Sequence, residues 1–213
     1  MPLNPQQIDR YSRQIIVPGM GGRAQERLLG SRLVLVGDGP NLEPALLYMT
    51  GAGVGTIELA TADDSGSTAP ADAMRHLNGD VTIVAFNSES RPAPDVILAI
   101  IESAASLNLA HDLLARFPRT PSVIARVDSP PRIVVLPSPP PCPRCAGDVL
   151  MSRPGGRAER APIIAMAATV EAFKLLAGYA KDSRANMIDF NGYESHLTRL
   201  APDPNCDCAK TGA

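Results

Sequence analysis

The chain has 213 residues, with 20 Lys and Arg against 22 Asp and Glu, so its formal net charge is -2. This length suits one α/β domain with a sizeable core, and the near-neutral charge without a basic run argues against nucleic acid or an anionic membrane as partner. No apolar run approaches the ~20 residues of a membrane span, and the segment 1–14 lacks the apolar core of a signal peptide. We therefore expect a cytoplasmic protein with no membrane or nucleic-acid partner.

Strand and helix patterns alternate from the first third of the chain onward. Residues 23–29 have helical spacing and end at Gly30. The apolar run 32–37 predicts a buried strand, a glycine turn follows it, and residues 42–48 again repeat apolar side chains at helical spacing. The glycines within 51–55 predict the end of this helix, and residues 56–60 predict a second buried strand.

The same alternation continues after a small, turn-forming segment at 61–71. It predicts a short helix at 72–77, strands at 81–86 and 95–100, a helix at 102–117, and strands at 122–126 and 133–136. Strands that alternate with helices predict a largely parallel, Rossmann-like α/β sheet with helices on both faces.

The C-terminal third begins with a proline-rich segment, 137–145, which can be neither a helix nor a central strand because proline lacks the backbone donor. Residues 161–179 predict an Ala-rich amphipathic helix with Gly178 near its end, and residues 186–190 and 195–200 predict an antiparallel hairpin. We expect a single domain over 1–213, made of a helical arm (1–30), a Rossmann-like core (31–136) and a zinc-clamped C-terminal part (137–213).

Four cysteines occur as two close pairs, Cys142 with Cys145 and Cys206 with Cys208. Close pairs in a reducing compartment favour a metal over a disulfide, and four thiolates complete a structural tetrahedral zinc shell with no open position. The site would consume every cysteine and leave none to form a thioester or persulfide. The alternative is four unrelated thiols, and the single residue between Cys206 and Cys208 is shorter than the usual spacing of zinc knuckles.

Gly37 and Gly39 lie between the first strand and a helix, where a nucleotide phosphate would sit on the N–H groups of the helix start. Leu42 stands where G-x-G-x-x-G has its third glycine, and Pro40 removes a donor from the loop. The alternative is a tight strand-to-helix turn without a ligand.

Several segments together resemble the ThiF/MoeB superfamily, the adenylating enzymes that include the ubiquitin-activating enzymes. They are RYSRQIIVPGMGGRAQERLLGSRLVLVGDG at 10–39, YMTGAGVGTIELA at 48–60, the two cysteine pairs, and the helix containing EAFKLLAG at 171–178. The resemblance implies an enzyme that binds ATP and Mg²⁺, activates the C-terminal glycine of a ubiquitin-like or sulfur-carrier protein as an acyl adenylate, and acts as a dimer. It also implies zinc at the four cysteines and, at Arg13 in the RY-x-RQ segment, an arginine that reaches the other subunit.

The chain departs from the family pattern at the groups that handle ATP. The segment 61–72 contains no Arg or Lys, and the first lysine of the chain is Lys174. Thr61 stands where the family has its ribose-binding aspartate. The family's magnesium-binding D-C-T-D-N aligns with 99–103, where Glu102 is the one acidic residue. These departures predict that the chain does not carry out adenylation alone.

Three functions follow as hypotheses. The leading one is a non-catalytic member that pairs with a complete paralogue, or forms a homodimer, supplies Arg13 in trans and helps to hold the carrier protein. The second is a working adenylyltransferase in which Gly37, Gly39 and Glu102 still serve ATP and Mg²⁺, with Arg75 as replacement cation and Asp63 at the ribose. The third is a nucleotide-free module that binds a peptide or a carrier protein.

Overall fold

The fold is taken from a computed structural model, which describes residues 2–61, 74, 76–87, 92–128, 130–147, 160–179, 184–191 and 194–210. The N-terminal arm and the first βαβ unit are α1 (Pro5–Arg10), α2 (Ser12–Ile15), α3 (Gly21–Gly30), β1 (Arg32–Val36), α4 (Leu42–Ala52) and β2 (Thr56–Ala60). The middle of the chain contains β3 (Thr82–Ala85), β4 (Val96–Ile101), α6 (Ala104–Arg116), β5 (Ser122–Arg126) and β6 (Arg132–Leu136). The C-terminal part contains the 3₁₀ helix η1 (Pro143–Ala146), α8 (Ala161–Ala177), β7 (Asn186–Asn191), β8 (Glu194–Arg199) and α9 (Asp207–Lys210).

The described strands form one eight-stranded sheet in the order β3-β2-β1-β4-β5-β6-β7-β8. The strands from β3 to β5 are parallel, whereas β6, β7 and β8 each run antiparallel to the neighbour before them. The predicted terminal hairpin is confirmed as β7 and β8. The antiparallel part also includes β6, because the connection 127–131 is far too short for a parallel crossover, which needs about a dozen residues.

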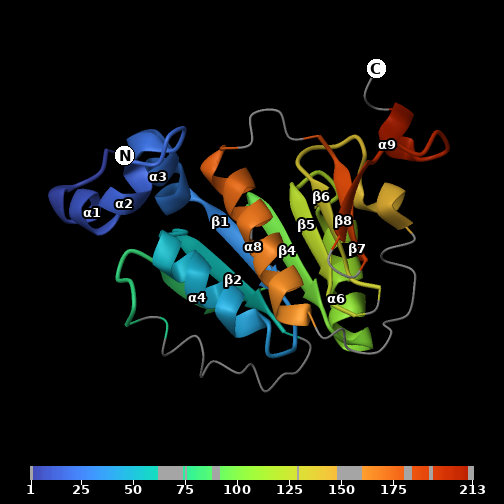
Figure 1. The fold of residues 1–213 in the computed structure, drawn as a ribbon, viewed down its shortest axis with the longest axis horizontal. Coiled ribbons are helices and arrows are strands. Elements are labelled where there is room, and N and C mark those ends of the chain that lie inside the picture. Colours follow the sequence, from blue (N-terminus) through green and yellow to red (C-terminus); the bar gives the residue numbers. More distant parts are fainter. Residues whose placement is uncertain are drawn as a thin grey trace.

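Helices cover both faces of the parallel part, as the alternating pattern predicts. Successive residues of β1 point to opposite faces, so Leu33 and Leu35 pack under α4 and α8, while Val34 and Val36 pack against α6. In Figure 1, α4 and α8 lie on the near face of the sheet. The order of strands reverses between β1 and β4, and in such sheets the crevice at the carboxyl ends of these strands is the usual ligand site.

Helix α8 is apolar on more than one side, which differs from the amphipathic helix that the sequence predicts. Its inward residues Ala161, Ala165, Ala168 and Ala172 are buried, and their small side chains let the helix approach β4 and β5 closely. On its outward side Ile163 and Val170 remain 64% and 53% exposed. Gly178 ends the helix in the left-handed conformation, as expected from the sequence.

Other expectations have mixed outcomes. The helix predicted at 42–48 continues to Ala52 and stops at Gly53. The segment 72–77 lies mostly outside the described residues. The proline-rich segment lacks α-helix and strand but ends in η1, which has Pro143 in its first turn. The division into 1–30, 31–136 and 137–213 stays a prediction. Among the described residues, no helix is both long and apolar enough to cross a bilayer.

Candidate functional site

The four cysteines lie together at one edge of the sheet. Strand β6 ends at Leu136, which pairs with Ser122 at the start of β5, so the chain leaves β6 at the edge where the parallel strands begin. Strand β8 ends at Arg199 opposite Asn186, at this same edge. Cys142 and Cys145 therefore follow one exit, Cys206 and Cys208 follow the other, and the two pairs meet although they are distant in sequence.

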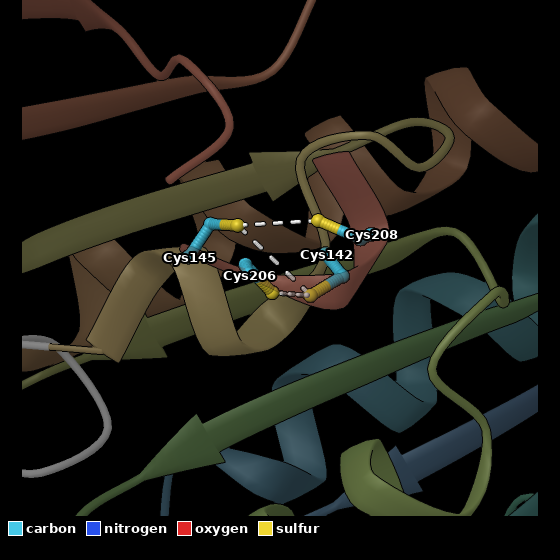
Figure 2. Close-up of side chains that lie close together, drawn as sticks. All are labelled: Cys142, Cys145, Cys206 and Cys208. Carbon is cyan, nitrogen blue, oxygen red and sulfur yellow. Dashed lines mark hydrogen bonds between the residues drawn. The ribbon is translucent and has the colours of Figure 1, made fainter. Parts of the chain in front are cut away.

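The sulfur atoms form a compact group, shown in Figure 2. The Sγ–Sγ separations are 3.5 Å for Cys142 with Cys206, 3.4 Å for Cys145 with Cys208 and 4.0 Å for Cys142 with Cys145. All four lie within 4.8 Å of one another and none is in a disulfide. A tetrahedron with Zn–S bonds of about 2.3 Å has edges of roughly 3.8 Å, so the donor set and its spacing fit a zinc ion.

The backbone around the cluster favours thiolates. The Asp203 N–H donates to Cys145 Sγ at 3.4 Å. The backbone N–H of Cys208, together with neighbouring thiols, lowers the pKa of Cys206 to about 7, whereas burial raises the pKa of Cys142 and raises that of Cys208 to about 12. The single residue between Cys206 and Cys208 does not prevent both from facing the first pair, because the chain turns there into α9. That the cysteines bind zinc remains a prediction that this geometry supports.

The opposite edge of the sheet contains the glycine loop between β1 and α4. Glu102 follows β4 there, and its carboxylate accepts from the Asn41 backbone N–H at 3.1 Å and from the Asn41 side-chain amide at 3.0 Å. Gly39 lies directly against this carboxylate, so that a Cβ at this position would overlap it. The structure thus brings Gly37, Gly39 and Glu102 together. The N–H of Asn41, at the start of α4, already has an anionic partner from this chain.

Two further contacts hold this edge together. The Ser103 hydroxyl, which caps α6, donates to Asp38 in the glycine loop. At the end of β5, the Arg126 guanidinium forms a two-pronged ion pair with Asp128, with Nε–Oδ1 at 2.8 Å and Nη2–Oδ2 at 2.6 Å. Both side chains of this pair are 4% exposed. Sequence reasoning missed Asp38, Asn41 and the Arg126–Asp128 pair. For Asn41 one signal was available, because an asparagine directly before a helix is a candidate N-cap residue.

Arg13 lies in α2, away from the glycine loop of its own chain. The neighbouring Tyr11 is buried, and its hydroxyl contacts Asn78 and Asp80, close to the start of β3. This is the amino edge of the parallel strands, whereas the glycine loop follows β1 at the carboxyl edge, about 16 Å away along five residues. Gly53, with φ of 84°, makes room for the tyrosine ring. The Arg13 side chain is exposed, and within the described parts of the chain it has no ion-pair partner.

An apolar hollow of about 680 Å³ lies next to α2, between α4 and α8. Gln14 forms part of its wall, together with apolar side chains of both helices. Several large apolar residues on or near this face are partly exposed: Leu47, Tyr48, Leu77, Ile163 and Val170. The residues Asp63 and Arg75, which the sequence offers as replacements at a nucleotide site, lie outside the described residues.

The chain thus combines a doubly wound, Rossmann-like sheet with a group of four cysteines that could hold a metal ion at the amino edge of its parallel strands. No protein-family model matches the sequence. The Aspergillus fumigatus protein "Adenylyltransferase and sulfurtransferase uba4" is 27% identical over 93% of this chain and 50% of its own length. The "SAMP-activating enzyme E1" of Haloferax volcanii is 33% identical over 54% of this chain and 44% of its own length. This chain thus spans about half the length of the curated relatives it matches.

Solved structures agree with the fold. The crystal structure of E. coli MccB with ATP superposes with a TM-score of 0.70 at 16% identity, covering 96% of this chain and 75% of that chain. PaaA gives a TM-score of 0.61 at 18% identity, over 93% of this chain and 75% of that one. The curated relatives support membership of the ThiF/MoeB superfamily, and the solved structures agree with its fold.

Proposed function

We propose that this chain is a non-catalytic subunit of a ThiF/MoeB-type adenylation complex. It pairs with a catalytically complete family member, supplies Arg13 to the nucleotide site of that partner, and helps to hold a ubiquitin-like or sulfur-carrier protein. Its curated relatives are called adenylyltransferases, sulfurtransferases and a SAMP-activating enzyme, which supports a role in activating such carriers.

The observation that carries the proposal is the position of Glu102. An N–H group at a helix start is a ready donor to phosphate, but the one from Asn41 donates to the Glu102 carboxylate. A triphosphate that approached this loop would meet the negative charges of Glu102 and Asp38. Adenylation requires positive charge near the α-phosphate, because an oxyanion must attack an already anionic group. The occupied N–H group and the two acids support the proposal that this loop does not bind ATP by itself.

Arg126, at the carboxyl end of β5, is a cation at this edge of the sheet, but it is buried in its ion pair with Asp128. Leu42 adds a further obstacle, since its side chain covers Gly37 where a third glycine would leave space for a phosphate. Several polar groups of the carboxyl edge are thus paired within the chain, although Asp38 Oδ1 is buried without a partner. These contacts support a fold that keeps its scaffold without an autonomous nucleotide site.

The position of Arg13 supports its action on another subunit. It is exposed, it lies toward the opposite edge from its own glycine loop, and Tyr11 fixes the segment that carries it. The hollow beside it exposes apolar residues of α4 and α8, a composition typical of an interface with another protein. A partner seated on α4 and α8 would place its surface next to Arg13.

The test is adenylation of a carrier protein by a reconstituted pair of this chain and a complete family member from the same organism. We expect Arg13→Ala to reduce the rate of the pair at least tenfold, as loss of a transition-state cation does. Arg23→Ala, which removes an exposed arginine of α3, should leave the rate unchanged. Undiminished activity of the Arg13→Ala pair would remove the trans-arginine role.

The names of the relatives favour a second candidate, an active ATP-dependent adenylyltransferase. It requires cations from residues outside the described part, such as Arg75, and an acid such as Asp63 for the ribose. ATP-dependent pyrophosphate exchange by the isolated chain would establish it. A nucleotide-free binding module is distinguished by a carrier affinity that changes neither with ATP nor with the paralogue.

A further inference from the structure

A cavity of about 590 Å³ opens beside the cysteine cluster, between the end of α6, the proline loop and the C-terminal segment. Cys142, Cys206 and Cys208 form one part of its wall. Arg119, just after α6, and Arg144, between the two cysteines of the first pair, form another part. Two arginines therefore line the same cavity as three of the four cysteines.

Both arginines have charges that the described part of the chain does not neutralise. Each side chain is exposed, and neither has an ion pair or a hydrogen bond among the described residues. Arg116, one turn earlier, differs because its guanidinium lies over the Phe117 ring at 5.3 Å and does not line the cavity. The acid in the cavity wall, Asp207, already has Lys210 at 3.4 Å.

The backbone holds the two arginines in place. Arg119 follows Pro118, in a turn closed by the Thr120 N–H and the Phe117 carbonyl at 3.1 Å. Arg144 lies within η1, after Pro143, and the Cys145 N–H closes this turn on the Cys142 carbonyl at 2.9 Å. Because proline fixes φ, the prolines before the two arginines restrict the backbone of these turns.

The charge of a loaded cluster matches these two cations. Four thiolates around a divalent ion have a formal charge of -2, and one ligand, Cys142, is only 5% exposed. We propose that Arg119 and Arg144 are the countercharges of the metal-loaded cluster and set its metal affinity. They bind no metal themselves and act as positioning residues through the electrostatic field at the thiolates. The inference concerns the metal centre alone, and it stands whether or not the chain binds ATP.

The experiment measures zinc affinity by competition with a chromogenic chelator on the full chain. We expect Arg119→Gln and Arg144→Gln each to weaken zinc binding about tenfold, and the double variant to weaken it about a hundredfold, because each change removes one positive charge from the field at a cluster of formal charge -2. Arg116→Gln removes the same charge outside the cavity and should bind zinc as the native chain does. Arg144→Lys keeps the charge and should retain affinity to within about threefold.

A second readout separates electrostatics from loss of the ligands. With Co²⁺ in place of zinc, all five variants should show the native thiolate-to-metal absorption band, since the ligand set is unchanged. Native zinc affinity in both Gln variants would overturn the proposal. It would also be overturned if Arg116→Gln weakened zinc binding as much as Arg144→Gln, or if a Gln variant lost the cobalt band, because either result makes the effect general or structural.

Discussion

The carboxyl and amino edges of the parallel strands differ in how their polar and charged side chains are paired. At the carboxyl edge, the acids Asp38, Glu102 and Asp128 each contact a group of the same chain, namely Ser103, Asn41 and Arg126. At the amino edge, four thiols face one another and two arginines face the adjoining cavity without a partner in the described residues. The acids of the first edge each have a partner from their own chain, although one oxygen of Asp38 is buried without one, whereas the second edge gathers thiols and cations that face a cavity.

This difference indicates where the chain can still receive a ligand. A crevice at a strand reversal is a general consequence of the doubly wound fold, but its use depends on which groups point into it. Here the Glu102 carboxylate accepts from the Asn41 N–H group, a donor that a phosphate at this loop would need. The cysteine edge, by contrast, presents four thiols whose spacing fits a metal ion.

Metal removal should have the largest effect, because a metal ion bound by the four cysteines would link the proline-rich loop to the C-terminal segment. At free zinc a thousandfold above Kd, bound metal adds about 4 kcal/mol to the free energy of unfolding, so chelation should lower Tm by roughly 10 °C. Cys142→Ser should reproduce this shift and abolish stoichiometric zinc in elemental analysis. Identical melting curves with and without metal would mean that the cluster does not hold the fold together.

Asp128→Ala tests the internal pairing of the carboxyl edge. The change leaves a buried guanidinium without the carboxylate that binds it twice, and breaking such a pair costs about 3 kcal/mol or more. Urea unfolding measures it. Asp189→Ala is the matched control, because Asp189 pairs with Arg132 at 3.3 Å while 34% exposed, and should cost under about 1 kcal/mol. Equal losses would show that the first pair is as solvated as the second.

Glu102→Ala opens the glycine loop and should have a moderate effect. It removes two hydrogen bonds to Asn41 and should lower the free energy of unfolding by about 1 to 2 kcal/mol. The freed N–H group should also let the variant bind phosphate more tightly than the native chain in a titration. Glu43→Ala, at an exposed site in the first turn of α4, serves as control. A native phosphate response from Glu102→Ala would break the contrast between the edges.

Tyr11→Phe should have the smallest effect, on the segment that carries Arg13. Losing the hydroxyl contacts should cost about 1 kcal/mol. Burial raises the pKa of Tyr11 to about 12, from an ordinary 10. The unfolded chain therefore releases this proton first, and stability should fall as pH rises from about 10 toward 12. Tyr11→Phe should flatten that decline, while Tyr48→Phe, at a 62% exposed position, should not.

The sequence predicts the scaffold well for physical reasons. Buried parallel strands such as 32–36 and 96–101 are continuous apolar runs, and glycine marks the end of the helices at Gly53 and Gly178. The cysteine pairs are equally legible, because four ligands need only be brought to one point. The direction of β6 was also available in principle from its short connection to β5.

The internal contacts of the carboxyl edge could not be predicted in this way. Whether Glu102 holds a metal ion or lies against the glycine loop depends on its exact distance from Gly39 and Asn41. The spacing of residues along the sequence does not determine that distance. The buried ion pair of Arg126 and Asp128 likewise looks like two surface charges at a strand end. The apolar side of α8 is exposed because neighbouring elements leave it uncovered. The hydrophobic periodicity of the helix sequence could not predict this, because it says nothing about neighbouring elements.

The most direct test of the central claim is calorimetric titration of the zinc-loaded chain with ATP and Mg²⁺, with a complete ThiF/MoeB enzyme as positive control. We predict no heat of binding for this chain at nucleotide concentrations that saturate the control. Saturable binding of comparable affinity would contradict the proposed role as a non-catalytic subunit.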